Sequence, residues 1–333
     1  MKGVDYRQSG VDIDAGNDAV RRIKALARST YTSGVLAGVG SFGGLFALDG
    51  RPADAVLVAS ADGVGTKLKV AFMAGVHDTI GVDLVNHCVN DILVQGAQPL
   101  FFLDYLATGR LAPEIAEQIV SGMARACREN GCALLGGETA EMPGFYAEGE
   151  YDVAGFIVGL VSRARMVDGH GIEAGDRLIG LPSSGLHTNG YSLARQVVFE
   201  RLGLGIDDHV PALGETVGEA LLRPHRSYLS LIAPLLDDGR IKGMAHITGG
   251  GITENLPRVL PDGRGFAIDR QSWTIPPIFT WLQSAGQVPE PEMFRAFNMG
   301  VGLAIVASPG NAGDLLSSLQ EAGEPAWILG EIT

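Results

Sequence analysis

Between residues 55 and 162, short apolar segments alternate with longer segments of helical periodicity, and this alternation limits the folds open to the chain. "AVLVASADG" (55–63) predicts a strand that runs into a glycine turn. Residues 77–96 carry apolar side chains at helical spacing, which predicts a buried helix. The pattern continues with a strand at 99–109, an amphipathic helix at 112–131 and strands at 132–138 and 151–162. Another helical stretch is expected earlier in the chain, around residues 17–28. Such alternation is typical of mixed α/β architecture.

A second unit begins near residue 170, where "EAGDRLIGLPSSG" predicts a strand that enters a polar loop. Helices are expected around 190–203, 215–236, 252–259 and 276–285, and strands at 243–248, 264–269, 300–307 and 325–332. We place the boundary within "RMVDGHGIEAGD", so that residues 1–168 form the N-terminal domain and residues 169–333 the C-terminal domain.

The length of 333 residues suits two domains, and 46% hydrophobic with 19% charged residues is typical of a globular protein. A net charge of −13 argues against a nucleic-acid-binding surface. An anionic substrate would therefore need a locally positive or metal-filled pocket. No apolar run is long enough to span a bilayer, and "MKGVDYRQSG" does not resemble a signal peptide.

The three cysteines, Cys88, Cys127 and Cys132, have no metal-ligand spacing and are odd in number, so we expect buried free thiols. Free thiols without an export signal favour a cytoplasmic location.

The 47 glycines gather in clusters, which is typical of backbone that approaches a ligand closely. "GVGSFGG" (38–44) fits the pattern G-x-G-x-x-G, but no helix of useful length follows, so the dinucleotide-binding context is missing. We interpret it as a loop that covers phosphates. The alternative is a glycine turn with a purely structural role.

"SADGVGTKLK" (60–69) looks like half of a phosphate-binding P-loop, but it is not one. The lysine follows the threonine rather than the glycine, and the upstream glycine is missing. None of the five lysines, at positions 2, 24, 67, 69 and 242, restores the pattern.

Four carboxylates stand at the ends of predicted strands or within a predicted helix. Asp62 precedes Gly63, Asp83 and Asp91 lie eight residues apart on one helix, and Glu138 follows two glycines. Converging carboxylates are what Mg²⁺ needs when it holds a polyphosphate. The alternative is helix caps and solvated charges, but Asp91 lies inside the apolar "CVNDILV", where a carboxylate needs a partner.

Two polar loops of the second unit each lead into a helix. In "PSSGLHTNGYSLAR" (182–195), the hydroxyls, His187, Asn189 and free helix N–H groups would suit an anion such as a ribose phosphate, although Asn189 would also serve as a helix cap. His187 is a candidate acid, base or phosphate donor. "AHITGGGITENLPR" (245–258) repeats the theme with His246, three glycines and Arg258.

These motifs together resemble the phosphoribosylformylglycinamidine cyclo-ligase (aminoimidazole ribonucleotide synthetase) family of purine biosynthesis. The stretches that carry the resemblance span almost the whole chain, in order. They are "YRQSGVDIDAGN", "GVGSFGG", "SADGVGTKLK", "GVDLVNHCVNDILVQGAQPLFFLDYLATG", "LLGGETAEMPGFY", "YDVAGFIVG", "PSSGLHTNGYSLAR", "HITGGGITENLPRVLP" and "FRAFNMGVGLAI". Ser41 departs from the glycine frequent in the family.

The resemblance implies a homodimer in which strands of the α/β N-terminal domain join those of the partner subunit in a shared barrel, beside an α+β C-terminal domain. It also implies ATP and Mg²⁺. The formyl oxygen of formylglycinamidine ribonucleotide is phosphorylated, the ribose-bearing nitrogen attacks that carbon, and phosphate leaves, which gives aminoimidazole ribonucleotide and ADP.

The resemblance also assigns roles to residues. Asp62, Asp91 and Glu138, with Asp83 in reserve, are the expected metal ligands. The expected nucleotide-binding residues are Lys24, Gly40, Ser41, Gly43, Gly44, Asp62, Gly63, Gly65, Thr66 and Lys67, in the N-terminal domain. The expected substrate-binding residues are Ser183, Ser184, His187, Thr188, Asn189, Gly249 and Gly250, in the C-terminal domain. The expected catalytic residues are His187, Lys67 and His246.

Related families share the acid and glycine pattern. Selenophosphate synthetase has a reactive cysteine or selenocysteine near its N-terminus, and the hydrogenase maturation factor has a C-terminal cysteine. Neither kind of cysteine is present in this sequence. Thiamine-monophosphate kinase remains a rival, and the larger amidotransferase relative needs a far longer chain. A catalytically silent ATP-binding or scaffold protein is a different class of alternative, against which the four retained carboxylates argue.

Overall fold

The alternating segments of the N-terminal half form one four-stranded sheet in the order β3-β6-β4-β5. The computed structural model describes residues 12–40 and 43–333. β3 (Ala55–Gly63) pairs antiparallel with β6 (Tyr151–Ser162), and β6 pairs antiparallel with β4 (Gln98–Thr108). β4 runs parallel to β5 (Ala133–Glu141), which requires the crossover helix between them. The strand predictions for this half are confirmed, at 55–63 and 151–162 to the residue.

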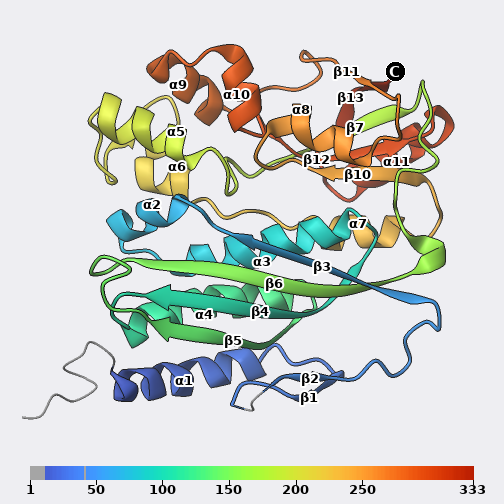
Figure 1. Cartoon of the computed structure of the whole chain (residues 1–333). Helices are drawn as coiled ribbons and strands as arrows, with labels where there is room; N and C mark the ends of the chain where they lie inside the picture. The colour runs from blue at the N-terminus through green and yellow to red at the C-terminus, as the bar shows by residue number, and fades with distance from the viewer. Residues whose placement is uncertain (1–11, 41–42) are drawn as a thin grey trace, which may run out of the picture.

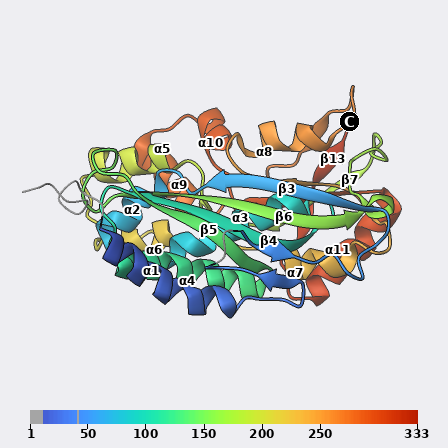
Figure 2. The same ribbon diagram turned by 60° about the horizontal axis from the view of Figure 1, so that its bottom comes forward.

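Two helices cover one face of this sheet. α3 (Asp78–Leu93) and α4 (Pro113–Glu129) pack against the strands and each other, and α1 (Ile13–Arg28) packs against α4 and β5 (Figures 1 and 2). The backbones of α3 and α4 touch, because a Cβ at Gly81 would collide with the Ile119 carbonyl and one at Gly122 with the Asp78 carbonyl. These two helical glycines therefore serve close packing.

Residues 80–90 of α3 are all buried, because the helix lies between the sheet on one side and the C-terminal half on the other (Figure 1). Its apolar residues recur at helical spacing, as predicted. Its polar positions form a stripe that is buried at Asp83, Asn86, His87 and Asn90 and half-buried at Asp91. This spacing puts the polar side chains on one face of the helix.

The other face of the sheet is open in this chain. Along β3, Leu57, Ala59 and Ala61 are exposed at alternate positions, and Phe156 on β6 stands opposite Ala61 in the register. Leu57 is 59% exposed and Phe156 44%. A two-stranded ribbon, β1 (Val35–Ala37) with β2 (Leu45–Phe46), lies beside β5. Ser41 of the predicted phosphate loop lies outside the described residues.

The C-terminal half is built on a five-stranded antiparallel sheet in the order β10-β12-β7-β13-β11. Its strands are β7 (Arg177–Pro182), β10 (Ile241–His246), β11 (Phe266–Ile268), β12 (Val301–Ala307) and β13 (Trp327–Ile332). β12, with every residue buried, is its core strand. Mixed α/β content is thus confirmed. The boundary proposed at 168/169 falls between β6 and β7, after the short helix η1 (Arg163–Arg165).

The predicted helix at 276–285 is confirmed within one residue, whereas the other three predicted helices are shorter or divided into pieces. The helices of this half are α5 (Tyr191–Arg195), continued by the π-helix η2 (Gln196–Arg201), α6 (Val217–Leu222), α7 (Leu229–Ile232) with η3 (Ala233–Leu235), α8 (Gly251–Asn255) with η4 (Leu256–Val259), α9 (Pro277–Gly286), α10 (Glu290–Ala296) and α11 (Pro309–Glu321). A small ribbon of β8 (His209–Val210) and β9 (Glu215–Thr216) precedes α6. Among the described helices, none combines the length and apolar character that a membrane span requires.

One predicted helix, 215–236, is wrong as a continuous element. The chain leaves helical geometry at Arg223 (φ −53°, ψ 123°), directly before Pro224. A residue that precedes proline is pushed toward extended backbone, and proline lacks the N–H that a helix interior needs. The resulting loop between α6 and α7 runs along α3, where its backbone meets the polar stripe.

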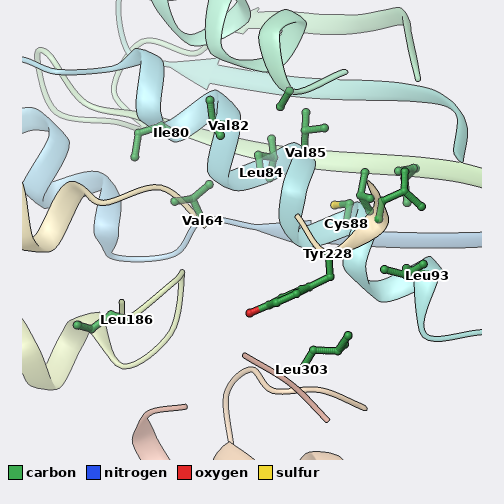
Figure 3. Packing of buried hydrophobic residues seen from close by; sticks show 14 of the residues in the cluster. Val64, Ile80, Val82, Leu84, Val85, Cys88, Leu93, Leu186, Tyr228 and Leu303 are labelled. Atoms are coloured by element: carbon green, nitrogen blue, oxygen red, sulfur yellow. The ribbon is translucent and has the colours of Figure 1, made fainter. Parts of the chain in front are cut away.

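The two halves share one hydrophobic core. Figure 3 shows the ring of Tyr228 among apolar side chains of both halves, with Leu84, Val85 and Cys88 of α3 on one side and Leu303 on the other. Tyr228 is fully buried, and its hydroxyl donates to the Pro182 carbonyl at 2.8 Å. Cys88, Cys127 and Cys132 are buried free thiols, as expected.

A buried ion pair of the N-terminal half is also hydrogen-bonded to the C-terminal half. α2 (Lys67–Ala74) begins at Lys67, whose Nζ lies 2.9 and 2.7 Å from the two carboxylate oxygens of Asp83 on α3. Both side chains have no solvent exposure. The same Nζ donates to the carbonyls of Arg223, at 2.9 Å, and His187, at 3.3 Å, in the C-terminal half. All three ammonium protons thus have acceptors within the protein.

We expect Lys67→Met to lower the free energy of unfolding by about 3–5 kcal/mol, because it leaves the Asp83 carboxylate buried without its cation. Lys69→Met is the matched control, since Lys69 pairs with Glu150 at the surface and should cost under about 1 kcal/mol. Lys67→Met combined with Asp83→Asn should recover part of the loss. Urea unfolding checks this, and equal effects of the two lysine variants would contradict it.

Candidate active site

Two carboxylates of the N-terminal half meet at one histidine. Asp62 lies at the end of β3, and Asp91 lies in the last turn of α3, which packs on β3. His87 is one helical turn before Asp91, and its Nε2 lies 2.8 Å from Asp62 Oδ2 and 3.8 Å from Asp91 Oδ2. Ser60 Oγ donates to Asp91 Oδ2 at 2.9 Å. The Asp62 side chain is 44% exposed, so the pair is open to a ligand.

The C-terminal half supplies the opposite wall. His246, the last residue of β10, has its Nδ1 2.8 Å from Asp91 Oδ1 and its Nε2 2.9 Å from His225 Nε2. Thr188 Oγ1 lies 2.7 Å from His87 Nδ1 and 3.4 Å from His225 Nδ1. Side chains from both halves therefore form one polar network, which exists only where the halves meet.

The electrostatics of this network follow from burial and pairing. Burial would raise the pKa of Asp62 and Asp91, but the hydrogen bonds of His87 to Asp62 and of His246 to Asp91, together with the charge of His87, outweigh it, so both pKa values lie below the usual value. Burial would lower the pKa of His87, but Asp62 and Asp91 raise it overall. Burial lowers the pKa of His246 and His225. Near neutral pH, the carboxylates are therefore ionised, and these two histidines are neutral.

His187 has an unusual backbone and an unpaired ring nitrogen. Its φ is +61°, in the left-handed region that non-glycine residues avoid. Its Nε2 accepts the Ser184 N–H at 3.1 Å, so in the neutral ring the proton is on Nδ1. Nδ1 is buried and has no hydrogen-bond partner among the described residues. Strained backbone and an unsatisfied buried donor are concentrated at functional sites.

The other expected substrate residues lie near His187 and His246. Ser183 and Ser184 use their hydroxyls within the protein, on the Asn298 side chain and the Pro224 carbonyl. Asn189 faces the glycine loop after His246, because a Cβ at Gly249 would lie 3.1 Å from Asn189 Oδ1. Gly250 has a φ of +92° and precedes α8. The structure thus brings the 183–189 and 249–250 loops together.

The four expected metal ligands are not brought together. Asp62 and Asp91 meet, but Asp83 is buried against Lys67. Glu138 is on β5, three strands from β3 in the sheet, which is about 14 Å at the usual strand spacing. Thr66, beside Gly65, contacts Ser192 of the C-terminal half, with 3.1 Å between the hydroxyl oxygens.

Glu138 belongs to a separate cavity of about 720 Å³. Its lining includes Gly40, Gly43, Gly44, Glu138 and Asp104. Lys24 of α1 reaches the same place, because a Cβ at Gly40 would lie 3.2 Å from its Nζ. Burial raises the pKa of Asp104 to about 7, and the charge of Glu138 adds to the effect. Gly40, Gly43 and Gly44 therefore line the same cavity beside Lys24, whereas Asp62 does not line it.

A second cavity, of about 580 Å³, opens beside the Asp91–His246 contact. Ser60, Asp91 and His246 line one part of it, and Thr248 and Arg258 line another. It lies between β3 of the N-terminal half and β10 with η4 of the C-terminal half. A ligand there would touch both halves of the chain.

The acids suit a hard divalent cation better than the histidines suit a transition metal. Each oxygen of Asp62 and Asp91 has lone pairs beyond those used by its protein donors, and Mg²⁺ prefers such oxygens. His187, His225 and His246 also cluster. However, the Nε2 of His187 is occupied by the Ser184 N–H and its Nδ1 carries the proton, so neither nitrogen offers a free lone pair.

The sequence did not single out three residues, namely His87 and His225 of the site and Asp104 of the separate cavity. His87 precedes Asp91 by four residues, a spacing that signals a shared helix face. Asp104 interrupts the apolar "PLFFLDYL", which is the signal that singled out Asp91. His225 follows a proline in an unremarkable loop, and no sequence signal marks it.

Solved structures share this fold at low sequence identity. Thiamine-monophosphate kinase from Stenotrophomonas maltophilia matches with a TM-score of 0.70 at 19% identity, covering 95% of this chain and 93% of that one. E. coli HypE matches with a TM-score of 0.66 at 20% identity, covering 94% and 90%. T. maritima PurL complexed with AMPPCP matches with a TM-score of 0.56 at 14% identity, covering 96% of this chain and 47% of that one. These likenesses show the fold.

Sequence comparisons are far more specific. The N-terminal domain of AIR synthase related proteins matches residues 43–161, and their C-terminal domain matches residues 173–333. A phosphoribosylformylglycinamidine cyclo-ligase of Trichlorobacter lovleyi is 55% identical over 98% of this chain and 94% of its own length. One of Desulfitobacterium hafniense is 56% identical over 99% and 97%. Such identity over the full length of both chains means that the protein belongs to the phosphoribosylformylglycinamidine cyclo-ligase family.

Proposed function

We propose that the protein closes the imidazole ring of formylglycinamidine ribonucleotide with ATP, giving 5-aminoimidazole ribonucleotide, ADP and phosphate, in de novo purine biosynthesis. The observation that carries this proposal is the full-length identity of more than half to cyclo-ligases. The meeting of Asp62, Asp91 and His87 with His246 at the junction of the halves is consistent with it.

In the proposed reaction the formyl oxygen attacks the γ-phosphorus of ATP, and ADP leaves. The ribose-bearing nitrogen then attacks the formyl carbon and loses its proton, and the C–O bond breaks with release of phosphate. Phosphorylation is needed because an amide oxygen is a poor leaving group. Catalysis of phosphoryl transfer consists mainly of charge neutralisation and positioning.

Asp62 and Asp91 are the residues that we propose to hold Mg²⁺. They are ionised and adjacent, and they are oriented by His87, His246 and Ser60. When bound, the cation would neutralise charge on the triphosphate. Asp83 is better explained as the partner of Lys67. Glu138 is a candidate for the cavity at the glycine loop, with Lys24 as the nearby cation.

We assign nucleotide binding to the N-terminal domain, residues 1–168, and substrate binding to the C-terminal domain, residues 169–333. The first assignment is supported by Gly40, Gly43 and Gly44 in the cavity beside Lys24. The second is supported by the unpaired Nδ1–H of His187 and by the proximity of Asn189 to Gly249. Clefts between domains commonly bring two substrates together in this way.

Lys67 fits a structural role better than the phosphate-binding and catalytic role first expected. Its three ammonium protons are shared among Asp83 and two backbone carbonyls, and it has no solvent exposure. Contact with a phosphate would break these bonds. We therefore propose that Lys67 holds the His187 loop in place.

We also propose a cytoplasmic homodimer with a barrel shared between subunits. The open face of the N-terminal sheet supports a partner, because Leu57 and Phe156 leave large apolar surfaces exposed on it. A second copy of the same sheet is the simplest cover for such a face.

A single-turnover assay tests the proposed function. Enzyme, ATP and formylglycinamidine ribonucleotide are mixed, and ADP and aminoimidazole ribonucleotide are quantified together. We expect equal amounts of the two products. ADP formation without ring closure, or phosphorylation of a different acceptor, would overturn the proposal.

Asp62→Asn should reduce turnover by about 10²–10³-fold while the melting temperature stays near that of the wild type, because one carboxylate for the cation is lost. Activity should also need more Mg²⁺. Asp314→Asn, at an exposed position of α11, controls for loss of a charge. Near wild-type turnover at limiting Mg²⁺ would exclude the metal role.

His187→Ala should weaken formylglycinamidine ribonucleotide binding by about tenfold or more, the cost of one hydrogen bond to a charged group, with little change in nucleotide affinity. Affinities for both ligands and the melting temperature are measured on the same variant. His187→Asn separates the effect of losing the ring from any effect on the backbone, because asparagine tolerates the left-handed conformation. His209→Ala, at an exposed position, is the control for loss of a histidine. A loss confined to nucleotide affinity would end the assignment.

Phe156→Glu should convert the dimer to a monomer, because it places a charge in the proposed subunit interface. Leu202→Glu, at an exposed apolar position of the C-terminal half, should leave the dimer intact. Sedimentation velocity across a concentration series measures both. A stable, active wild-type monomer at assay concentration would contradict the dimer.

A further inference from the structure

Two strained turns lie side by side at one end of the C-terminal sheet. β7 and β12 are antiparallel neighbours, so the loop that leaves β7, residues 183–187, lies beside the turn that enters β12, residues 298–300. His187 in the loop has a φ of +61°, and Met299 in the turn has a φ of +52°. Non-glycine residues rarely adopt this left-handed backbone, which persists only where the surrounding structure enforces it.

The side chain of Asn298 links the loop to the turn. It is 2% exposed. Its Oδ1 accepts the Gly300 N–H at 2.8 Å in its own turn and the Ser183 hydroxyl at 2.9 Å in the loop. Its Nδ2 donates to the Gly185 carbonyl at 2.9 Å. A backbone N–H can only donate and a carbonyl can only accept, so these partners fix the orientation of the amide.

The loop that Asn298 holds also positions the ring of His187. The Ser184 N–H donates to His187 Nε2 at 3.1 Å, and the residues on either side of Ser184 are the two that bond to Asn298. The ring also lies against β12, because a Cβ at Gly302 would lie 2.8 Å from His187 Cε1. The position of the ring thus depends on how firmly the loop is fastened to the 298–300 turn.

We propose that Asn298 is a positioning residue that fastens the 183–187 loop to β12 and so holds the His187 ring ready for the substrate. A loop that is ordered beforehand loses less conformational entropy when a ligand binds, so the fastening should contribute to affinity for that ligand. Asn298 is buried and acts through His187 rather than by touching the substrate. The effect on affinity rests on the substrate-binding role proposed for His187, whereas the fastening of the loop does not.

Asn298→Leu removes the three hydrogen bonds while filling a similar space. We expect affinity for formylglycinamidine ribonucleotide to fall about tenfold or more, with ATP affinity within about threefold of wild type. Ser183→Ala removes one of the three bonds and should lower substrate affinity by about threefold.

Thr108→Val is the matched control. The Thr108 hydroxyl is buried at the end of β4, where it lies 3.1 and 2.9 Å from the carbonyl oxygens of Arg110 and Glu150. Its loss also removes hydrogen bonds of a buried side chain, so the melting temperature should fall in both variants. Substrate affinity should fall only in the Asn298 variant, which separates positioning from a general loss of stability.

A double-mutant cycle tests whether Asn298 acts through His187. Substrate affinity is measured for Asn298→Leu, His187→Ala and the double variant. If Asn298 serves the substrate by positioning this ring, the double variant should bind like His187→Ala, within about twofold. Losses that add in full would mean that Asn298 acts independently of the ring, and would overturn the proposal.

Hydrogen–deuterium exchange of the free protein provides a readout that needs no substrate. The backbone amides of residues 183–187 should exchange about tenfold faster or more in Asn298→Leu than in the wild type, and at the wild-type rate in Thr108→Val. This measurement stands even if the wild-type protein fails to close the imidazole ring. Failure of the proposed reaction is therefore distinguishable from failure of the fastening.

Exchange at the wild-type rate in Asn298→Leu would overturn the fastening, and unchanged substrate affinity despite faster exchange would overturn the positioning role. Ser183→Ala decides between these outcomes if the leucine variant does not fold, since it keeps two of the three bonds. Unchanged exchange at 183–187 together with unchanged substrate affinity in that variant would likewise contradict the proposal.

Discussion

Four residues of the polar stripe of α3, Asp83, Asn86, His87 and Asn90, are buried, so their polar groups need partners within the protein, and several of these partners come from the C-terminal half. Asp83 takes the ammonium of Lys67 and the backbone N–H of His225, and Asn90 accepts the backbone N–H of Tyr228. An unpaired buried polar group costs about 1–3 kcal/mol, so a displaced C-terminal half would forfeit several such bonds at once. The relative position of the halves is therefore set by hydrogen bonds as well as by the shared core.

The same constraint builds the site. Asp91 is the last polar residue of the stripe, and its neighbours His87 and His246 come from different halves. A protein with a net charge of −13 would have to neutralise charge locally to bind the anionic substrates proposed above. Here the imidazoles of His87 and His246 contact the carboxylates of Asp62 and Asp91, and this is the arrangement that the proposed cation site would use. Neither half alone contains this arrangement.

The sequence predicted the elements whose bounds and burial depend on local residue patterns. β3 and β6 were bounded to the residue because their apolar runs end at glycine or polar turns, and the spacing in α3 predicted its burial. The predicted helix at 215–236 is wrong because Pro224 ends the helix at the residue before it. α11 was missed because "PGNAGDLLSSLQE" opens with proline and two glycines.

The site was predicted less completely, for a different reason. The acidic and histidine motifs were recognised singly, but their pairing depends on distances across the fold. Lys67 looked like a phosphate ligand because nothing in "GVGTK" reveals that Asp83, sixteen residues later, takes its charge. Glu138 looked equivalent to Asp62 because strand order is not visible in the motifs.

The three buried thiols give the N-terminal half a chemical reporter of its own motions. Cys88 lies on α3, Cys127 on α4 and Cys132 just before β5, and the C-terminal half contains no cysteine. Burial raises the pKa of the Cys88 and Cys127 thiols, so almost no thiolate is present while the helices stay closed. The rate at which these thiols are alkylated therefore measures how often the layer of α3, α4 and β5 opens to solvent.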